Sequence, residues 1–256
     1  MTTFGCCLHL DREKLSALHE AGYTCYEDAL TRVVDTPEEE LKAFRDFADG
    51  LGMTCVSMNG MFPGELPLLT CAPEAIKAYL EKALPKAEIL SPGVIVLGSG
   101  KARAIPEEMT REQAEDIFCE RLKNVILPMC EQYGFRVAIE ELRREECNFL
   151  HTCGEVMNIV RRVNRPSLGL LLDYYHAVLG GDTPDMMAKC GSSIFHVHMA
   201  SPINDRAFPT DMDTPAMKDF FAMLARIGYQ GCVSLEGKAA GDFASSVREA
   251  IRVMKA

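Results

Sequence analysis

The chain has 256 residues, 48% of them hydrophobic and 25% charged, with a net charge of −10 at pH 7. Nucleic-acid-binding proteins usually carry a basic face, so this acidic balance argues against that class of partner. The eleven cysteines include no Cys-x-x-Cys pair, which indicates reduced, buried thiols rather than a disulfide framework. The chain lacks a signal-peptide pattern and an apolar stretch of membrane-spanning length, so we expect a cytoplasmic protein with no membrane partner.

Short apolar segments alternate with amphipathic segments along the whole chain. The predicted strands are Phe4–Leu10, Gly22–Glu27, Thr54–Asn59, Gly93–Gly98, Gly134–Glu140, Ser167–Asp173, Ser193–Met199 and Gly231–Glu236. Alternation of strand and helix predicts a parallel sheet covered by helices. Eight such units in a chain of this length predict a (β/α)8 TIM barrel, with residues 1–256 forming a single domain.

The segments between the strands carry helix signals. A capping threonine with a following Glu, Gln or Pro predicts helix starts at Thr36, Thr110, Thr152 and Thr214. Pro128 is expected to kink the helix predicted over residues 111–133. Residues 60–71 and 99–110 are predicted to be long loops above the barrel. Such loops cover substrates in this architecture, and the second carries two cations, Lys101 and Arg103.

Each of the last four predicted strands carries, as its last or next-to-last residue, one that can bind a metal ion. These residues are Glu140, Asp173, His198 and Glu236. A strand buried on both faces should stay apolar, so polar endings are unexpected unless they line a site. Three carboxylates and an imidazole suit a divalent ion, whose charge would offset their repulsion. A salt bridge or helix cap would explain any one of the four, but we favour a metal site for four in succession.

Three further histidines are predicted to lie near this site. His176 follows Asp173 by three residues and is expected either to face a substrate or to take a capping or packing role. His196 shares the strand parity of His198 and is predicted to lie one layer deeper, as a core or supporting residue. His9 ends the first predicted strand and is expected to reach the same mouth.

The motifs around these residues resemble those of the sugar phosphate isomerase/epimerase superfamily of xylose-isomerase-like TIM barrels. That superfamily includes ketose 3-epimerases, hydroxypyruvate isomerases and inosose dehydratases. The matching segments are Glu140-x-Leu142-x-Arg144-x-Glu146-x-Asn148, Gly169-Leu170-Leu171-Leu172-Asp173-x-x-His176, His196-Val197-His198, Leu235-Glu236, Gly98-Ser99-Gly100-Lys101-Ala102-Arg103 and Ile227-Gly228-Tyr229-x-Gly231.

The resemblance implies roles for individual residues. The four strand-end residues would bind one divalent metal ion, Mn²⁺ by preference, with Mg²⁺, Co²⁺ or Zn²⁺ as alternatives. Glu140 and Glu236 would also serve as the acid/base pair. The implied substrate-binding residues are Glu146, His176, Arg206, His9, Asn59 and Lys101. Arg206 follows His198 by eight residues, whereas ketose epimerases place an arginine six residues after a Gly-Glu pair that this chain lacks.

The implied function is a metal-dependent sugar or sugar phosphate isomerase or epimerase. It would abstract a proton next to a carbonyl through a metal-stabilised enediolate, acting on a small sugar or keto acid, and it could form a dimer or tetramer. An inosose-type dehydratase and a catalytically silent sugar-binding barrel are the alternatives. An AP endonuclease is disfavoured, because Asn59 and Gly98 stand where that class places histidines.

Overall fold

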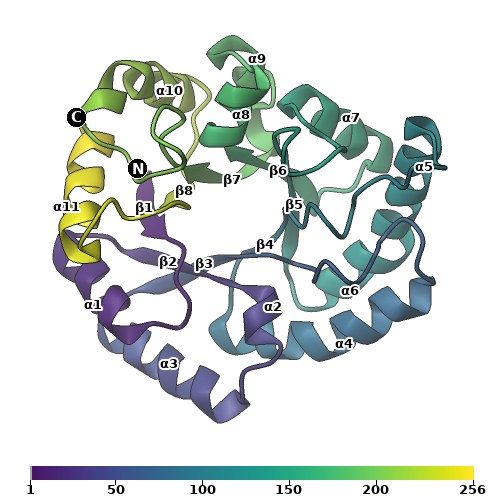
Figure 1. The fold of residues 1–256 in the computed structure, drawn as a ribbon. Coiled ribbons are helices and arrows are strands. Elements are labelled where there is room, and N and C mark those ends of the chain that lie inside the picture. The colour runs from purple at the N-terminus through teal and green to yellow at the C-terminus, as the bar shows by residue number, and fades with distance from the viewer. Residues whose placement is uncertain (1) are drawn as a thin grey trace.

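Eight parallel strands stand at the centre of the computed structural model, which describes residues 2–256 (Figure 1). The strands are β1 (Thr3–Cys6), β2 (Cys25–Ala29), β3 (Thr54–Asn59), β4 (Val94–Leu97), β5 (Arg136–Glu140), β6 (Leu168–Asp173), β7 (Ile194–Met199) and β8 (Cys232–Leu235). Each strand from β2 to β7 pairs with the next strand in the chain, and β8 pairs with β1. The seam between β1 and β2 is bridged at Cys7 and Glu27. The predicted TIM barrel is therefore confirmed.

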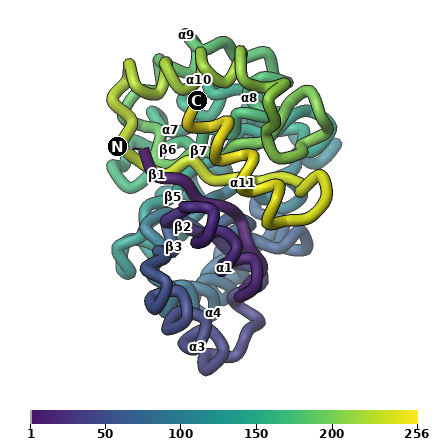
Figure 2. Tube along the Cα trace, turned by 90° about the vertical axis from the view of Figure 1, so that its left-hand side faces the viewer, coloured from purple at the N-terminus to yellow at the C-terminus, as the bar shows by residue number. Residues whose placement is uncertain are grey.

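A ring of helices surrounds this barrel. The helices are α1 (Arg12–Ala21), α2 (Leu30–Val33), α3 (Glu38–Gly50), α4 (Pro73–Leu90), α5 (Arg111–Arg121), α6 (Leu127–Gln132), α7 (Cys153–Val163), α8 (Tyr174–Gly180), α9 (Pro184–Ala188), α10 (Thr214–Arg226) and α11 (Phe243–Met254). Figure 2 shows α11 lying beside α1, so the last helix closes the ring against the first. No helix within residues 2–256 combines the length and apolar character needed to cross a membrane.

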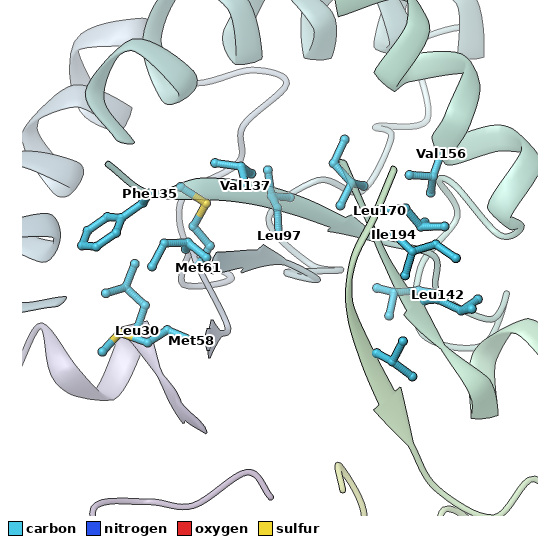
Figure 3. Close-up of a cluster of buried hydrophobic side chains, with 14 of the residues drawn as sticks. Leu30, Met58, Met61, Leu97, Phe135, Val137, Leu142, Val156, Leu170 and Ile194 are labelled. Carbon is cyan, nitrogen blue, oxygen red and sulfur yellow. The ribbon is translucent and has the colours of Figure 1, made fainter. Parts of the chain in front are cut away.

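The strands divide their side chains between two apolar regions, as their two-residue period requires. Outward-facing residues pack against the helices, as Leu97 and Val137 do in the main core (Figure 3). A smaller cluster contains Ala138 and Leu171, which lie two residues before Glu140 and Asp173 on their strands. This apolar layer lies beneath the polar strand ends and separates them from the opposite mouth of the barrel.

Two predicted strands are wrong by three or more residues at one end. β1 ends at Cys6 instead of Leu10, so His9 is not a strand end, and its side chain is exposed. Strand β2 starts at Cys25 and continues to Ala29, two residues beyond its predicted end. Glu27 therefore lies inside the strand.

The predicted helix-start signals are confirmed only in part. Thr110 forms the predicted capping box with Gln113. Thr36 does not cap α3, because its hydroxyl donates to the Arg32 carbonyl at 2.9 Å and the helix begins after Pro37. Thr152 accepts from the Glu155 N–H, but the Glu155 carboxylate turns instead to the N–H of His151.

The helix predicted over residues 111–133 is interrupted, as expected from Pro128. A π-helical turn spans Leu122–Ile126, directly before α6. Proline has no N–H to give to the preceding turn, and a wider turn accommodates the missing hydrogen bond.

Candidate metal centre and active site

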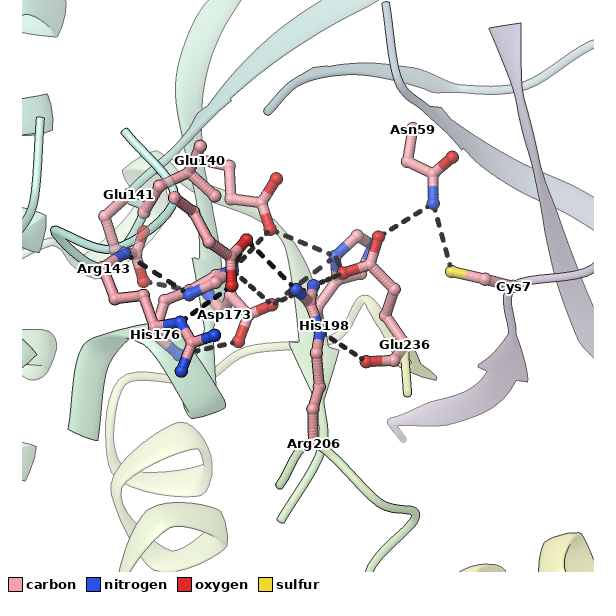
Figure 4. A network of polar contacts seen from close by, with 12 residues as sticks. Cys7, Asn59, Glu140, Glu141, Arg143, Asp173, His176, His198, Arg206 and Glu236 are labelled. Atoms are coloured by element: carbon pink, nitrogen blue, oxygen red, sulfur yellow. Dashed lines mark hydrogen bonds and ion pairs between the residues drawn. The ribbon is translucent and has the colours of Figure 1, made fainter. Parts of the chain in front are cut away.

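The four strand-end residues converge at one mouth of the barrel. Glu140, Asp173, His198 and Glu236 each offer one ligand atom, and these atoms lie within 4.8 Å of one another (Figure 4). His198 Nδ1 is 3.4 Å from Glu236 Oε2, 3.6 Å from Glu140 Oε1 and 4.0 Å from Asp173 Oδ2. Donor atoms sharing one ion at bonds of about 2.1 Å are about 3 Å apart at right angles. A small contraction of this cluster would therefore suit a single cation.

Three of the four ligand atoms have no hydrogen-bond partner among the described residues. They are Glu140 Oε1, Asp173 Oδ2 and His198 Nδ1, and all three are buried. Leaving a buried polar atom unpaired costs about 1–3 kcal/mol, and more for a charged group. Three such atoms facing one another are explained by a shared cation, and the donor set fits a divalent ion that accepts oxygen and nitrogen ligands.

The second oxygen of Asp173 is occupied, which fixes the direction of the first. Asp173 ends β6 and caps α8, and its Oδ1 accepts from the His176 N–H at 3.0 Å. The backbone N–H of Asp173 donates to Glu141 Oε1 at 3.0 Å. Helix cap and strand end thus hold Asp173 with Oδ2 turned toward the cluster.

Glu27 is a functional residue that the sequence analysis missed. It is fully buried inside the barrel. Its Oε2 accepts from His198 Nε2 at 3.1 Å and its Oε1 accepts from His196 Nε2 at 2.5 Å. Burial opposes ionisation, but the two imidazoles hold the pKa of Glu27 well below its ordinary value. The carboxylate can only accept, so Nε2 of His198 keeps its proton, and a His198 that binds a metal ion would do so through the Nδ1 lone pair turned toward the cluster. Without an ion, burial opposes a charge on His198, but Glu236 and Glu27 raise its pKa.

His196 takes the supporting position that its parity predicted. It lies buried below His198 and its contact with Glu27 satisfies one ring nitrogen. The signal that could have found Glu27 is the same one that marked the other four residues. A charged residue in an otherwise buried strand needs a polar or charged partner inside the barrel.

Arg206 brings a positive charge against the carboxylates. Its guanidinium forms an ion pair with Glu236 and lies 3.4 Å from Glu146 Oε2 and 3.7 Å from Asp173 Oδ2. Arg206 and the preceding Asp205 both have left-handed backbone conformations, with φ of 61° and 43°. These two residues turn the loop inward, so Arg206 reaches the site despite its altered spacing from His198.

His176 is buried next to the same cluster. Its Nδ1 accepts from the Arg143 N–H at 3.4 Å, which leaves the proton of the neutral ring on Nε2. Nε2 has no hydrogen-bond partner and lies 3.8 Å from Glu146 Oε2 and 4.0 Å from Glu140 Oε1. Burial lowers the pKa of His176. The ring is therefore a neutral donor aimed at the site.

A cavity of about 700 Å³ opens above these residues. Its lining residues include six of the predicted site residues: Asn59, Lys101, Glu140, Glu146, Arg206 and Glu236. Asp173, His176 and His198 lie buried and do not line it. His9 is not among the lining residues, since the chain leaves β1 before reaching it.

The two predicted cover loops meet at the rim of this cavity. The Phe62 N–H donates to Ser99 Oγ at 2.9 Å, and the Leu68 N–H donates to the Ala102 carbonyl at 2.7 Å. The second loop carries two cations, Lys101 and Arg103, which were expected to lie over the barrel mouth. This expectation is wrong for Arg103.

Arg103 is fully buried beneath the loop. It donates from Nη1 to the Leu97 carbonyl at 3.0 Å and from Nη2 to the Glu140 carbonyl at 2.6 Å. The guanidinium thereby ties the ends of β4 and β5 together. It fixes the backbone that carries Glu140, and Lys101 remains the one loop cation of the two that lines the cavity.

Gly98 makes room for the Glu140 side chain. A Cβ added at Gly98 would overlap the Glu140 carboxylate. We expect Gly98→Ala to displace Glu140 and to lower divalent-metal affinity by about 10–100-fold, measured by calorimetric titration of metal-free protein. Gly50→Ala is the matched control, because a Cβ there meets no atom within 4 Å. Equal affinities for both variants would show that Glu140 does not need this space to act.

Comparison with known proteins assigns the chain to a family. A sequence profile described as "Xylose isomerase-like TIM barrel" matches residues 15–256. The chain therefore belongs to the xylose isomerase-like TIM barrel family. The resemblance found from the strand-end motifs is confirmed.

Individual relatives cover parts of the chain. It is 28% identical over 147 residues to an inosose isomerase of Halalkalibacterium halodurans, a match covering 54% of this chain and 51% of that protein. It is 26% identical over 245 residues to a 3-dehydroshikimate dehydratase of Pseudomonas putida, covering 88% of this chain and 35% of that protein. The matches thus span about half or less of these relatives' lengths.

Solved structures share the fold over the whole chain. A crystal structure of D-psicose 3-epimerase in the presence of D-fructose matches with a TM-score of 0.85. The match covers 99% of this chain and 97% of that chain at 18% sequence identity. At this identity the likeness establishes the barrel architecture alone.

Proposed function

We propose that the protein is a divalent-metal-dependent isomerase or epimerase of a sugar or sugar phosphate. The observation that carries the proposal is the set of three buried, unpartnered ligand atoms that face one another beneath a polar cavity. Family membership supports it, because proteins named as an isomerase and an epimerase are similar to this chain in sequence or fold. Glu140, Asp173, His198 and Glu236 would hold the ion, with Mn²⁺ as our first expectation.

When bound, the ion would supply positive charge beside the carbonyl of the substrate and so acidify the neighbouring C–H bond. The protein's own residues would then handle the proton. Burial and the nearby charge of Glu236 raise the pKa of Glu140. Burial acts on Glu236 in the same direction, but His198 and Arg206 outweigh it and lower the pKa of Glu236. Two carboxyl groups whose pKa values are pushed apart suit complementary roles, one as acid and one as base.

The surrounding side chains are suited to hold a polyhydroxylated substrate. His176 presents an unpaired Nε2–H, and Glu146 offers carboxylate oxygens next to it. Asn59, Arg206 and Lys101 add donors around the cavity. Fixed donors and acceptors of this kind orient a substrate by its hydroxyl groups. We propose these five residues as the substrate-binding set and leave out His9.

Exchange of solvent deuterium into candidate substrates tests the proposal. With Mn²⁺ present, at least one compound in a panel of ketoses, keto acids and inososes should gain deuterium next to its carbonyl, read by NMR. Exchange reports proton abstraction even when the final product is unknown. Metal-free protein is the control and should show none. Absence of exchange across the panel, together with absence of tight metal binding, would reject the enzyme in favour of a silent barrel.

Dehydration is a second candidate reaction, favoured by the match to a dehydratase over 88% of this chain. The first step would be the same proton abstraction. Loss of the hydroxyl group on the next carbon would then replace return of the proton, and His176 or Glu146 would be placed to protonate it. Mass spectrometry of the same panel separates the reactions, because only dehydration removes water from the product.

A further inference from the structure

A cysteine stands at the C-terminal end of the first strand, beside the proposed metal centre. Cys7 directly follows β1, and its backbone N–H donates to the Leu235 carbonyl at 2.9 Å. It is therefore the β1 neighbour of Glu236, which follows β8. Its ligand atom lies within 4.8 Å of those of His198 and Glu236, so the three form a cluster that could hold an ion.

The amide of Asn59 joins the cysteine to the glutamate. Asn59 Nδ2 donates to Glu236 Oε1 at 2.9 Å and to Cys7 Sγ at 3.5 Å (Figure 4). The imidazole of His198 also lies close to the thiol, with their ligand atoms within 4.8 Å of each other. The buried Nδ1 of His198 has no hydrogen-bond partner. A thiol, an imidazole and a carboxylate are thus held together at the edge of the cluster, and the imidazole carries an unsatisfied ring nitrogen.

We propose that Cys7, His198 and Glu236 form a second, thiolate-containing site for a softer divalent ion, Zn²⁺ by preference, that overlaps the oxygen-rich centre. Thiolate ligands favour zinc, whereas sets of carboxylates favour manganese or magnesium. The inference rests on the proposed metal-dependent function, because two ligands are shared. The two sites share His198 and Glu236, so we expect them to hold one ion at a time.

The binding step is a simple exchange at sulfur. The Cys7 S–H bond breaks, its proton passes to solvent, and the sulfur electron pair forms the bond to Zn²⁺. An ion held by Cys7 would sit toward β1 and β8, away from Glu140 and Asp173 on β5 and β6. Zinc would therefore occupy the centre without using two of the four ligands proposed for catalysis, and we expect it to inhibit.

Titration of metal-free protein with Co²⁺, Zn²⁺ and Mn²⁺ tests the site. Cobalt bound to sulfur gives a thiolate charge-transfer absorption that oxygen ligands do not give. We expect this band in the wild type and its loss in Cys7→Ser. Zn²⁺ affinity should fall about tenfold or more in Cys7→Ser, while Mn²⁺ affinity should stay within about threefold. Cys71→Ser is the matched control, because Cys71 is also half-buried and free but lies outside the cluster.

The outcomes separate this inference from the proposed function. A wild type without the cobalt–thiolate band overturns the thiolate site whether or not the variant folds. A band that persists in a Cys7→Ser variant with the circular dichroism spectrum of the wild type also overturns it, since the ten other thiols are then still packed as in the wild type. Tight Mn²⁺ binding without any thiolate band leaves the function standing and rejects the inference. A thiolate band in a protein that binds no Mn²⁺ supports the inference and counts against the proposed function.

Discussion

Replacing Glu236 by glutamine should lower the rate of deuterium exchange into substrate by about 10²–10⁴-fold, even at saturating metal. The amide keeps the shape of the side chain but can neither take nor return a proton near neutral pH. It also removes one negative charge from the ligand set, so Mn²⁺ affinity should fall as well. Exchange at several metal concentrations, read by NMR, separates the two losses, because added metal restores only the second.

One control variant and two contrary outcomes test this prediction. Glu39→Gln makes the same charge change on the exposed face of α3 and should leave exchange and metal affinity unaltered. Saturating Mn²⁺ that restores wild-type exchange in Glu236→Gln would show that Glu236 acts as a ligand only. Unchanged metal uptake together with unchanged exchange would remove Glu236 from the site.

The fold and the strand-end residues could be predicted from the sequence for one physical reason. The carboxyl ends of parallel barrel strands meet at one mouth, so their order in the chain suffices to bring their last residues together. Asp173 and His198 therefore needed no knowledge of loops or side-chain rotamers. Strand β3, Thr54–Asn59, was also predicted with its correct bounds, because turn residues flank a short apolar run.

The residues that were misjudged depend on contacts across the barrel or beneath a loop. Arg103 reads locally as a loop cation, yet two buried carbonyl groups draw it under the loop. His9 was predicted to end the first strand because the apolar pattern continues beyond Cys6. Strand β1 itself ends at Cys6. The chain instead turns at Leu10, where φ is 52° and the N–H donates to Asp28 Oδ2 at 2.6 Å.

Glu27 is the clearest case of a role that local pattern cannot report. It lies on β2, between β3 and the bridge to Cys7, and its side-chain partners lie on β7 across the interior of the barrel. Strand periodicity can show that a side chain points inward, but it does not show what that side chain meets there. The same geometry would make Glu27 a positioning residue in the proposed metal centre, because it would act on a bound ion through the tautomer of His198.

Glu27→Gln should therefore lower Mn²⁺ affinity by about 10–100-fold without touching the ion itself. A glutamine offers one carbonyl oxygen, so only one of the two imidazoles can still donate to it. The other ring faces the NH₂ group and must accept. If that ring is His198, its proton moves to Nδ1 and the ligand lone pair is lost. Calorimetry gives the affinity, and nitrogen NMR of the histidine rings reads the tautomer, which a merely structural role would not change.

Asp28→Asn is the matched control on the same strand. Asp28 is also buried, but its oxygens accept from the backbone N–H groups of Leu10 and Ala29, outside the His198 network. Burial raises the pKa of Asp28 to about 7, so its neutral form is already accessible near neutral pH. We expect wild-type Mn²⁺ affinity and an unchanged His198 tautomer in Asp28→Asn. Wild-type affinity in Glu27→Gln as well would contradict the positioning role of Glu27, because the metal ion alone would then be sufficient to hold the proton of His198 on Nε2.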